Sequence, residues 1–186
     1  METKNCICTQ ITERLSRSFS HAQEELIDKT WNFNRQGAFS PNIMFTSREE
    51  KQTNVDEAIK AWAAENEVNL VEITEENSVL ENLWEMATEG NLTAYYLRTT
   101  ENTFDMLNTP NTVLYFKRID KITNKLFRTR LLRFMNNQSV TFGDEKVHFA
   151  KNILFSVLTI SDEMDKYECR ELINDSKDGF AIIDLK

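Results

Sequence analysis

Five short apolar runs, separated by longer segments of mixed character, dominate the hydrophobic pattern of the chain. The runs cover residues 42–45, 68–73, 112–116, 153–160 and 181–185. Most of them are apolar at nearly every position, which is typical of strands buried on both faces of a sheet. The pattern therefore predicts about five strands of one largely buried sheet.

Helical spacing of apolar residues marks several of the segments between these runs. It is clearest in residues 9–32, 55–65 and 125–135, where apolar side chains recur at intervals of three and four. The first segment predicts one helix, or two helices with a break near residues 18–21. Residues 74–102 form a longer variable segment to which we assign no element.

Strands that alternate with helices indicate an α/β fold. We expect a three-layer α/β/α sandwich with a mostly parallel five-stranded sheet. Residues 1–38 are predicted to form an N-terminal helical segment that packs on the core, and residues 39–186 the α/β domain, in one globular unit. A chain of 186 residues is long enough to bury such a core.

The charge balance and the cysteine content restrict the classes of function. The chain has 30 acidic and 22 basic residues, a formal net charge of −8, which argues against nucleic-acid binding by the whole surface. Three cysteines without a CxxC pair, and no apolar leader, predict a reducing, cytoplasmic location. No run has the ~20 apolar residues of a membrane span. The two histidines have no metal-ligand spacing, so we expect neither a metal nor a cofactor.

Five sequence blocks have the order and spacing of a known family core. NIMF, the polar stretch TSREEKQTN and the helix VDEAIKAW are similar to the strand, phosphate loop and first helix of AAA+ ATPases, most closely the MoxR-like branch. TVLYFKRIDK resembles the Walker B strand, ILFSVLTISDE the sensor-1 strand, and ELINDSKDGFAIIDL the stretch that normally holds an arginine. The resemblance covers about residues 15–185 and implies a P-loop NTPase-type fold. Because the chain ends at Lys186, directly after the fifth predicted strand, we expect no C-terminal helical lid.

The stretch TSREEKQTN lacks the chemistry of a phosphate loop. It contains no glycine, whereas the GxxxxGK[ST] loop needs glycines to close backbone N–H groups around phosphate. If Lys51 takes the place of the family's lysine, Gln52 stands at the Mg²⁺-binding hydroxyl; if Thr53 takes the hydroxyl position, Gln52 stands at the lysine. In both alignments Glu49 and Glu50 face the triphosphate, where like charge opposes binding.

The end of the Walker B-like strand departs from the family in charge. The resemblance places Lys117 and Arg118 where the family has two carboxylates, of which one holds Mg²⁺ and the other polarises the attacking water. Neither side chain can coordinate a cation or act as a base near neutral pH. Asp120 follows two positions later and would be a weak substitute.

Two further positions complete the comparison with the AAA+ pattern. Thr159 or Ser161 matches the sensor-1 residue that positions the water, and either hydroxyl retains that capacity. The three residues before the last aromatic, where the arginine is expected, are Lys177, Asp178 and Gly179. Three of the four chemical positions therefore depart from the pattern, and the resemblance implies a pseudo-ATPase that is not an enzyme.

A basic run follows the Walker B-like strand. Seven of the 22 cations fall in residues 117–133, and three of them, Lys121, Lys125 and Arg128, recur at helical spacing and so line one face. Three interpretations remain: a solvated helix face, a contact with an acidic or phosphate-bearing partner, and a nucleic-acid site. The acidic total of the chain disfavours the last.

The predicted function is that of a catalytically inactive AAA+-like interaction module, an adaptor or regulator of a protein partner. The partner is expected to be an active AAA+ ATPase, another protein or a second copy of the chain, bound near residues 117–133 and 162–180. One alternative is a residual nucleotide-binding ATPase that uses Lys51, Thr53 and Asp120. A second is a nucleic-acid-binding accessory protein that uses the basic helix.

Overall fold

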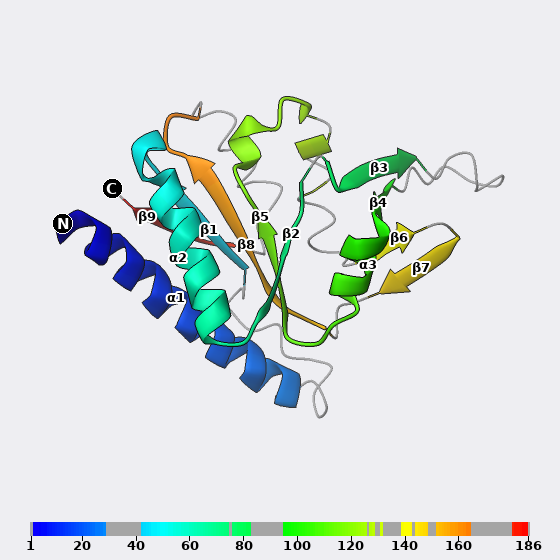
Figure 1. Ribbon diagram of the computed structural model, residues 1–186, viewed down its shortest axis with the longest axis horizontal. Coiled ribbons are helices and arrows are strands. Elements are labelled where there is room, and N and C mark those ends of the chain that lie inside the picture. Colours follow the sequence, from blue (N-terminus) through cyan, green and yellow to red (C-terminus); the bar gives the residue numbers. More distant parts are fainter. Residues whose placement is uncertain are drawn as a thin grey trace.

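Five parallel strands form the central sheet of the computed structural model, which describes residues 2–28, 42–74, 76–82, 95–125, 127–128, 131, 139–142, 144–148, 152–164 and 180–185. The strands are β1 (Asn42–Ser47), β2 (Asn69–Glu72), β5 (Thr112–Phe116), β8 (Ile153–Ser161) and β9 (Phe180–Leu185). They lie in the order β2-β5-β8-β1-β9 (Figure 1), and every neighbouring pair is parallel. The five apolar runs thus correspond to the five strands, and β5 and β8 are buried along their whole length.

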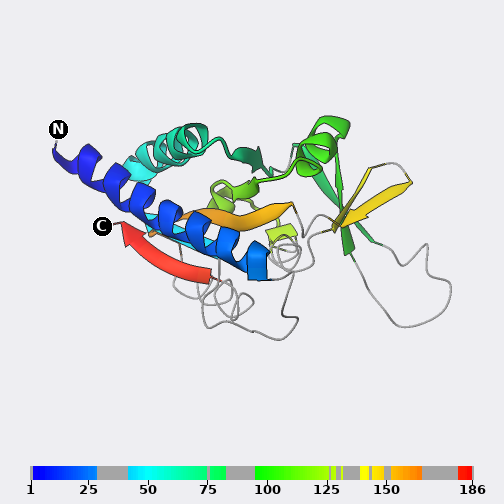
Figure 2. The ribbon, with the colours of Figure 1, turned by 90° about the horizontal axis from the view of Figure 1, so that it is seen from below.

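Two helices cover one face of this sheet. They are α1 (Glu2–Asp28) and α2 (Gln52–Glu65), which contact each other along the sheet (Figure 2). Apolar side chains of both helices, among them Leu15 and Trp62, pack on Phe155 of β8 in one buried cluster. Trp62 lies edge-on to Phe19 and tilted against Phe155, with ring centroids 6.0 and 5.8 Å away.

Helix α1 continues through residues 18–21, so the alternative of a break there is wrong. Ser18 is buried between Leu15 and Ala22, which keeps the buried stripe in register through this segment. The opposite side of the helix is polar, with Glu13, Arg17 and Glu24 exposed or half-buried. Among the described helices none is both long and apolar enough to cross a membrane.

Helical residues also cover the second face, which completes the three layers. Phe104 and Leu107 of α3 (Glu101–Leu107), together with Leu131, pack on Leu114 and Phe116 of β5 in a second buried cluster. The helix predicted over 125–135 is helical at 125, 127, 128 and 131, and its other residues lie outside the described part. The α/β/α arrangement expected from the sequence is therefore present.

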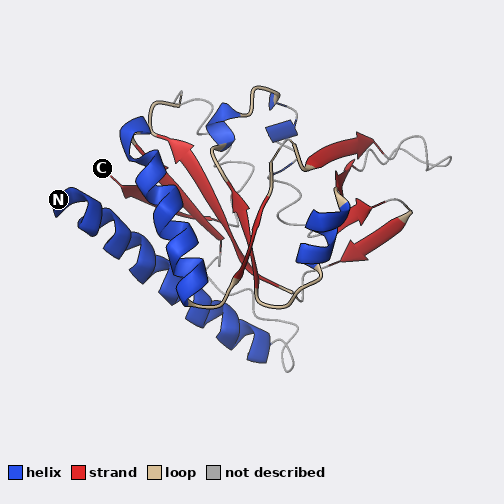
Figure 3. Cartoon of the chain, in the orientation of Figure 1, coloured by secondary structure: helices blue, strands red, loops and turns tan. Residues whose placement is uncertain are grey.

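A second, four-stranded sheet stands beside the first, next to β2 and β5 (Figures 1 and 3). It contains β3 (Ser78–Asn82), β4 (Tyr95–Thr99), β6 (Ser139–Phe142) and β7 (Glu145–His148), in that order. β4 and β6 are parallel, while β3 and β7 each run antiparallel to their neighbour. The sequence analysis did not predict this sheet, because its strands mix apolar with polar residues and form no continuous apolar run like those of the first sheet.

Candidate functional site

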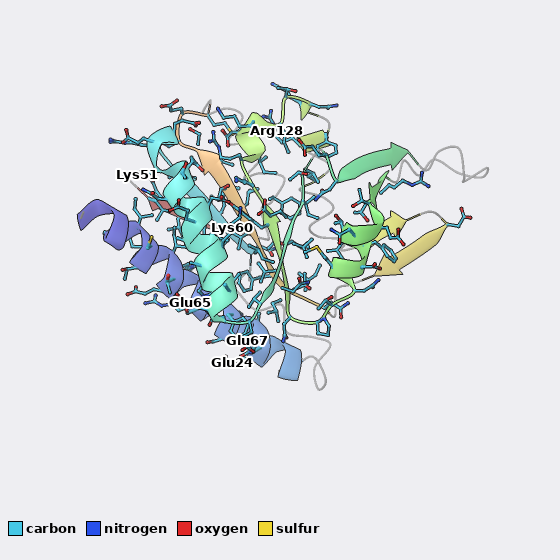
Figure 4. The ribbon with its side chains drawn as sticks, viewed as in Figure 1. Glu24, Lys51, Lys60, Glu65, Glu67 and Arg128 are labelled. Atoms are coloured by element: carbon cyan, nitrogen blue, oxygen red, sulfur yellow. The ribbon has the colours of Figure 1, made fainter. Side chains whose placement is uncertain are left out.

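The carboxyl ends of the three central strands place the predicted site residues at one end of the molecule. Strands β5, β8 and β1 are neighbours, so the segments that follow them meet there, in the position where open α/β sheets bind ligands. We call residues 48–52, 117–121 and 159–163 the carboxyl edge. Lys51 lies at this end of the molecule and Glu65 at the other (Figure 4).

The connection that follows β1 is much shorter than the predicted nine-residue loop. Strand β1 runs through Ser47, Arg48 alone separates it from the 3₁₀ turn Glu49–Lys51, and α2 begins at Gln52. The N–H of Lys51 donates to the carbonyl of Arg48 at 2.9 Å, and the N–H of Gln52 donates to the carbonyl of Glu49. These two amides are therefore already used within the turn. Without glycine the segment is poorly suited to an open loop, and Glu49 and Glu50 favour a helical start.

Gln52 is a buried crosslink between α2 and the sheet, and it does not face an open site. The residue is 7% exposed, and its Nε2 donates to the carbonyl of Ser47 at 3.1 Å and to that of Ile160 at 2.8 Å. The residue that the alignment placed at the Mg²⁺ hydroxyl or at the lysine thus ties α2 to the ends of β1 and β8. Its neighbours differ, since Thr53 is exposed and Lys51 is half-buried.

Arg118 is the centre of the carboxyl edge. Its backbone is left-handed, with φ 52° and ψ 56°, and its N–H donates to Oγ1 of Thr159 at 3.0 Å. Its guanidinium donates to both oxygens of Asp120, at 3.0 and 2.6 Å. It donates also to both oxygens of Glu49, from Nη1 at 3.0 Å and from Nη2 at 2.6 Å. One cation therefore holds two carboxylates from different parts of the chain.

The ion pairs of this group favour the charged forms of Arg118 and Glu49. The hydrogen bonds that Arg118 donates to Asp120 raise the pKa of Arg118 above its usual value, because they and those to Glu49 outweigh the effect of burial. The hydrogen bonds from Arg118 lower the pKa of Glu49, and Lys121, whose Nζ lies 3.5 Å from Glu49 Oε1, acts in the same direction. Both oxygens of Asp120 accept hydrogen bonds from Arg118. The carboxylate that the sequence analysis considered as a substitute metal ligand is therefore already bonded to a cation.

A second ion cluster, centred on Asp56 of α2, holds Lys117. Asp56 Oδ2 lies 3.0 Å from Lys117 Nζ and 3.2 Å from Lys60 Nζ, and its Oδ1 accepts from the Tyr115 hydroxyl at 3.1 Å. Lys60 also pairs with Glu72 at 3.0 Å. Burial raises the pKa of Asp56, but the two lysines outweigh it and the net shift is downward. We call these five residues the Asp56 cluster.

The sequence analysis did not single out Asp56. The signal was present, because Asp56 and Lys60 stand at the i,i+4 spacing of a helical ion pair. The sequence did not reveal that Lys117, which lies 61 residues away, is the third partner. Lys117 therefore stands at the predicted strand end, but its charge is directed to α2.

The two hydroxyls expected at the sensor-1 position are both buried and bonded within the chain. Thr159 accepts the Arg118 N–H, and Ser161 Oγ accepts the N–H of Glu163 at 3.2 Å. Thr159 is thus brought next to the Walker B-like strand end, as the resemblance implies, but its partner is a backbone amide.

The three cations expected on one helix face do not lie on one face. Lys121 belongs to the 3₁₀ turn Ile119–Lys121, and the helix begins only after Asn124, whose side chain accepts the N–H of Phe127 at 3.1 Å. Lys121 and Lys125 are exposed, whereas Arg128 is only 7% exposed. The interruption at residues 122–124 breaks the helical register, and the apolar stem of arginine permits burial. This corrects the expectation for Arg128.

Comparisons with known proteins assign the chain to no family. No family model matches the chain, and no curated protein matches it. Among solved structures, a crystal structure of NtrX from Brucella abortus in complex with ADP has a TM-score of 0.45 and 13% sequence identity. That likeness covers 88% of this chain and 36% of the NtrX chain. It is too distant to carry a function over, so the α/β fold rests on the five-stranded parallel sheet itself.

Proposed function

We propose that this chain is a catalytically inactive AAA+-like module that acts by binding a protein partner. The observation that carries the proposal is the position of the Arg118 guanidinium between Glu49 and Asp120 at the carboxyl edge. In that position the chain supplies both the cation and the anions of the site from its own residues. An enzyme that hydrolyses a nucleotide needs free carboxylates there, to hold Mg²⁺ and to activate water.

The residues of the carboxyl edge are poorly suited to bind the Mg²⁺ ion that nucleotide hydrolysis needs. Asp120 is 8% exposed and already neutralised by Arg118. A Mg²⁺ ion beside it would be repelled by the charge of Arg118, whose Nη2 lies 2.6 Å from Asp120 Oδ2. We therefore expect no productive metal binding between β5 and β8.

The carboxyl edge is also poorly suited to bind the triphosphate of a nucleotide. The amides of Lys51 and Gln52 are used in the turn after β1, and the Glu49 carboxylate occupies the donors of Arg118. A triphosphate would have to displace this carboxylate and would still lack a cradle of open N–H groups. These observations disfavour the alternative of a residual nucleotide-binding ATPase.

The nucleotide part of the proposal is tested by thermal unfolding and phosphate release with millimolar ATP and Mg²⁺. At a ligand concentration of about 100 times Kd a binding site gains about 2.7 kcal/mol, which raises Tm by roughly 5–10 °C in a chain of this size. We expect no increase beyond that seen with sodium chloride at equal ionic strength, and no phosphate above the protein-free rate. A saturable increase that requires both ATP and Mg²⁺ would show instead that a nucleotide site survives.

The partner part is tested separately by sedimentation velocity, with the chain alone and mixed with an active AAA+ ATPase from the same source. Lys121 and Lys125 are exposed at the proposed contact, so we expect a complex, or a self-associated species, that weakens in Lys121→Glu/Lys125→Glu. The control is Glu101→Gln/Asp105→Gln, which changes two exposed residues on α3, outside the proposed contact. A monomer that ignores the ATPase in every mixture contradicts an adaptor role, whatever the nucleotide result.

A further inference from the structure

Arg118 has two carboxylate partners that differ in how firmly they are held. Asp120 is two residues away in the chain and its side chain is 8% exposed. Glu49 reaches Arg118 from the turn before α2, 69 residues away in the chain, and its side chain is 47% exposed. Exposed ion pairs contribute little to stability, so Glu49 is the partner that a solute can replace.

The atoms around the Glu49 carboxylate form a binding site for an anion that presents two oxygens. Nη1 and Nη2 of Arg118 contact its two oxygens at 3.0 and 2.6 Å, and Nζ of Lys121 lies 3.5 Å from Oε1. A planar guanidinium that donates in parallel to two oxygens suits phosphate as well as it suits carboxylate. The donors of this binding site can therefore accept a phosphate group in place of the Glu49 carboxylate.

The charge of this binding site also favours an external anion once the Glu49 side chain has moved away. Arg118 and Lys121 then contribute two positive charges against one negative charge from Asp120, which leaves a formal charge of +1. Arg48 directly precedes Glu49 in the sequence; its side chain is 62% exposed and lies 3.9 Å from Glu50. A dianionic phosphate monoester carries more charge than the single carboxylate that it would displace.

We propose that Arg118 and Lys121 form an oxyanion site for the phosphate group of a phosphate monoester, and that Glu49 is its built-in inhibitor. The site uses neither a metal nor a cradle of backbone amides, so it is independent of the proposed loss of ATP hydrolysis. Free phosphate and a phosphorylated segment of a partner protein share the chemistry that it recognises. The Glu49 side chain must swing away for either to bind.

The test compares Glu49→Gln with Glu50→Gln in titrations with inorganic phosphate, at constant ionic strength, by calorimetry and ³¹P NMR. Both variants remove one negative charge from the same turn, but only the first frees Arg118, because Glu50 contacts Arg48 and not Arg118. Removing a competing exposed ion pair is expected to tighten phosphate binding about fivefold in Glu49→Gln. Glu50→Gln is expected to bind as the unchanged chain does.

Two further variants complete the design. Lys121→Gln added to Glu49→Gln is expected to lose most of the gain, and Glu49→Asp, with a carboxylate one methylene shorter, to show part of it; the latter also serves if Glu49→Gln does not fold. A phosphoserine peptide, titrated beside free phosphate, distinguishes a phosphorylated partner from the free anion. Equal phosphate affinity in the Glu49 and Glu50 variants overturns the proposal, even if the chain proves inert toward ATP.

Discussion

At the scale of single residues, Arg118 combines a costly backbone with a well-paired side chain. A left-handed conformation costs a residue with a Cβ roughly 1–2 kcal/mol, and φ is 52° here. The turn is held by the hydrogen bond to Thr159 and by the ion pairs to Asp120 and Glu49. The side-chain contacts thus offset a strain that glycine would not have.

This balance predicts different effects for two truncations of Arg118. Arg118→Ala and Arg118→Gly both remove the ion pairs and leave Asp120 unpaired, but only alanine keeps the left-handed penalty. We expect both variants to be destabilised in urea titrations, and Arg118→Gly to be the more stable of the two by about 1 kcal/mol. Equal stability, or a less stable glycine variant, would mean that the turn is not strained.

The chemical character of the carboxyl edge was readable from the sequence, but its pairing was not. Lys117 and Arg118 were identified as cations at the end of a buried strand, and the structure places them there. Their partners Asp56 and Glu49 lie 61 and 69 residues away. Such contacts depend on which strands are neighbours, and no local pattern contains the strand order.

At the scale of elements, the start of α2 is fixed by the sheet. Gln52 donates to the carbonyls of Ser47 and Ile160, at the ends of β1 and β8. The carbonyl of Ser47 also accepts the N–H of Asp162 at 3.0 Å. The first turn of α2 is thereby bonded to two strands, so the helix needs no side-chain cap, and none is present at Lys51.

The crosslink predicts a measurable cost for changing Gln52. Gln52→Leu keeps the approximate volume but leaves two buried carbonyls without this donor, so we expect a loss of about 1–3 kcal/mol in the free energy of unfolding. Gln52→Glu places a carboxylate against the same carbonyls, and its loss should grow as pH rises through the pKa of that carboxyl group. Thr53→Ala, at an exposed neighbouring position, should change stability by less than ~0.5 kcal/mol. Chemical denaturation from pH 4 to 8 checks all three, and a Leu variant as stable as the Thr53 control would remove the crosslink from the account.

Element prediction succeeded where apolar runs were long and failed where local signals were weak. The five strands of the main sheet follow from continuous burial, which leaves a strong composition signal. The strands of the second sheet mix apolar with polar residues, so this composition signal is missing there. The spacing of Lys121, Lys125 and Arg128 suggested a helix, but residues 122–124 lie outside any helix, and spacing alone does not reveal such an interruption.

At the scale of the whole molecule, two ion clusters tie the first layer of helices to the sheet. Glu49 comes from the turn before α2 and Asp56 from α2 itself, and both are held by cations that directly follow β5. Lys60 of α2, which is labelled in Figure 4, extends the Asp56 cluster to Glu72 of β2. Charges supplied by the chain therefore connect the elements that surround the carboxyl edge.

This arrangement sets how stability depends on pH. The pKa values of Asp56 and Glu49 are lowered by their cations, so their contribution is present above the ordinary carboxyl pKa of about 4 and is lost as pH falls through the folded-state values. Glu72 and Asp56 raise the pKa of Lys60, and burial raises that of Tyr115. The contributions of these two are present below an ordinary pKa of about 10 and are lost as pH rises through the folded-state values. We expect a stability plateau from about pH 5 to 9 with a decline on each side.

The Asp56→Asn variant separates this mechanism from a general effect of net charge. An amide cannot pair with Lys117 and Lys60, so we expect a loss on the order of 1–2 kcal/mol on the plateau. The acid decline should become shallower, because only Glu49 remains. The alkaline decline should also become smaller and end at a lower pH, because Lys60 then retains Glu72 alone and its pKa is raised less. Asp105→Asn makes the same change of charge on the exposed side of α3 and should shift neither decline. If both variants reproduce the unchanged pH profile in denaturation series from pH 2 to 11, the Asp56 cluster does not connect α2 to β5 energetically, and the packing of Trp62 on Phe155 must hold that layer instead.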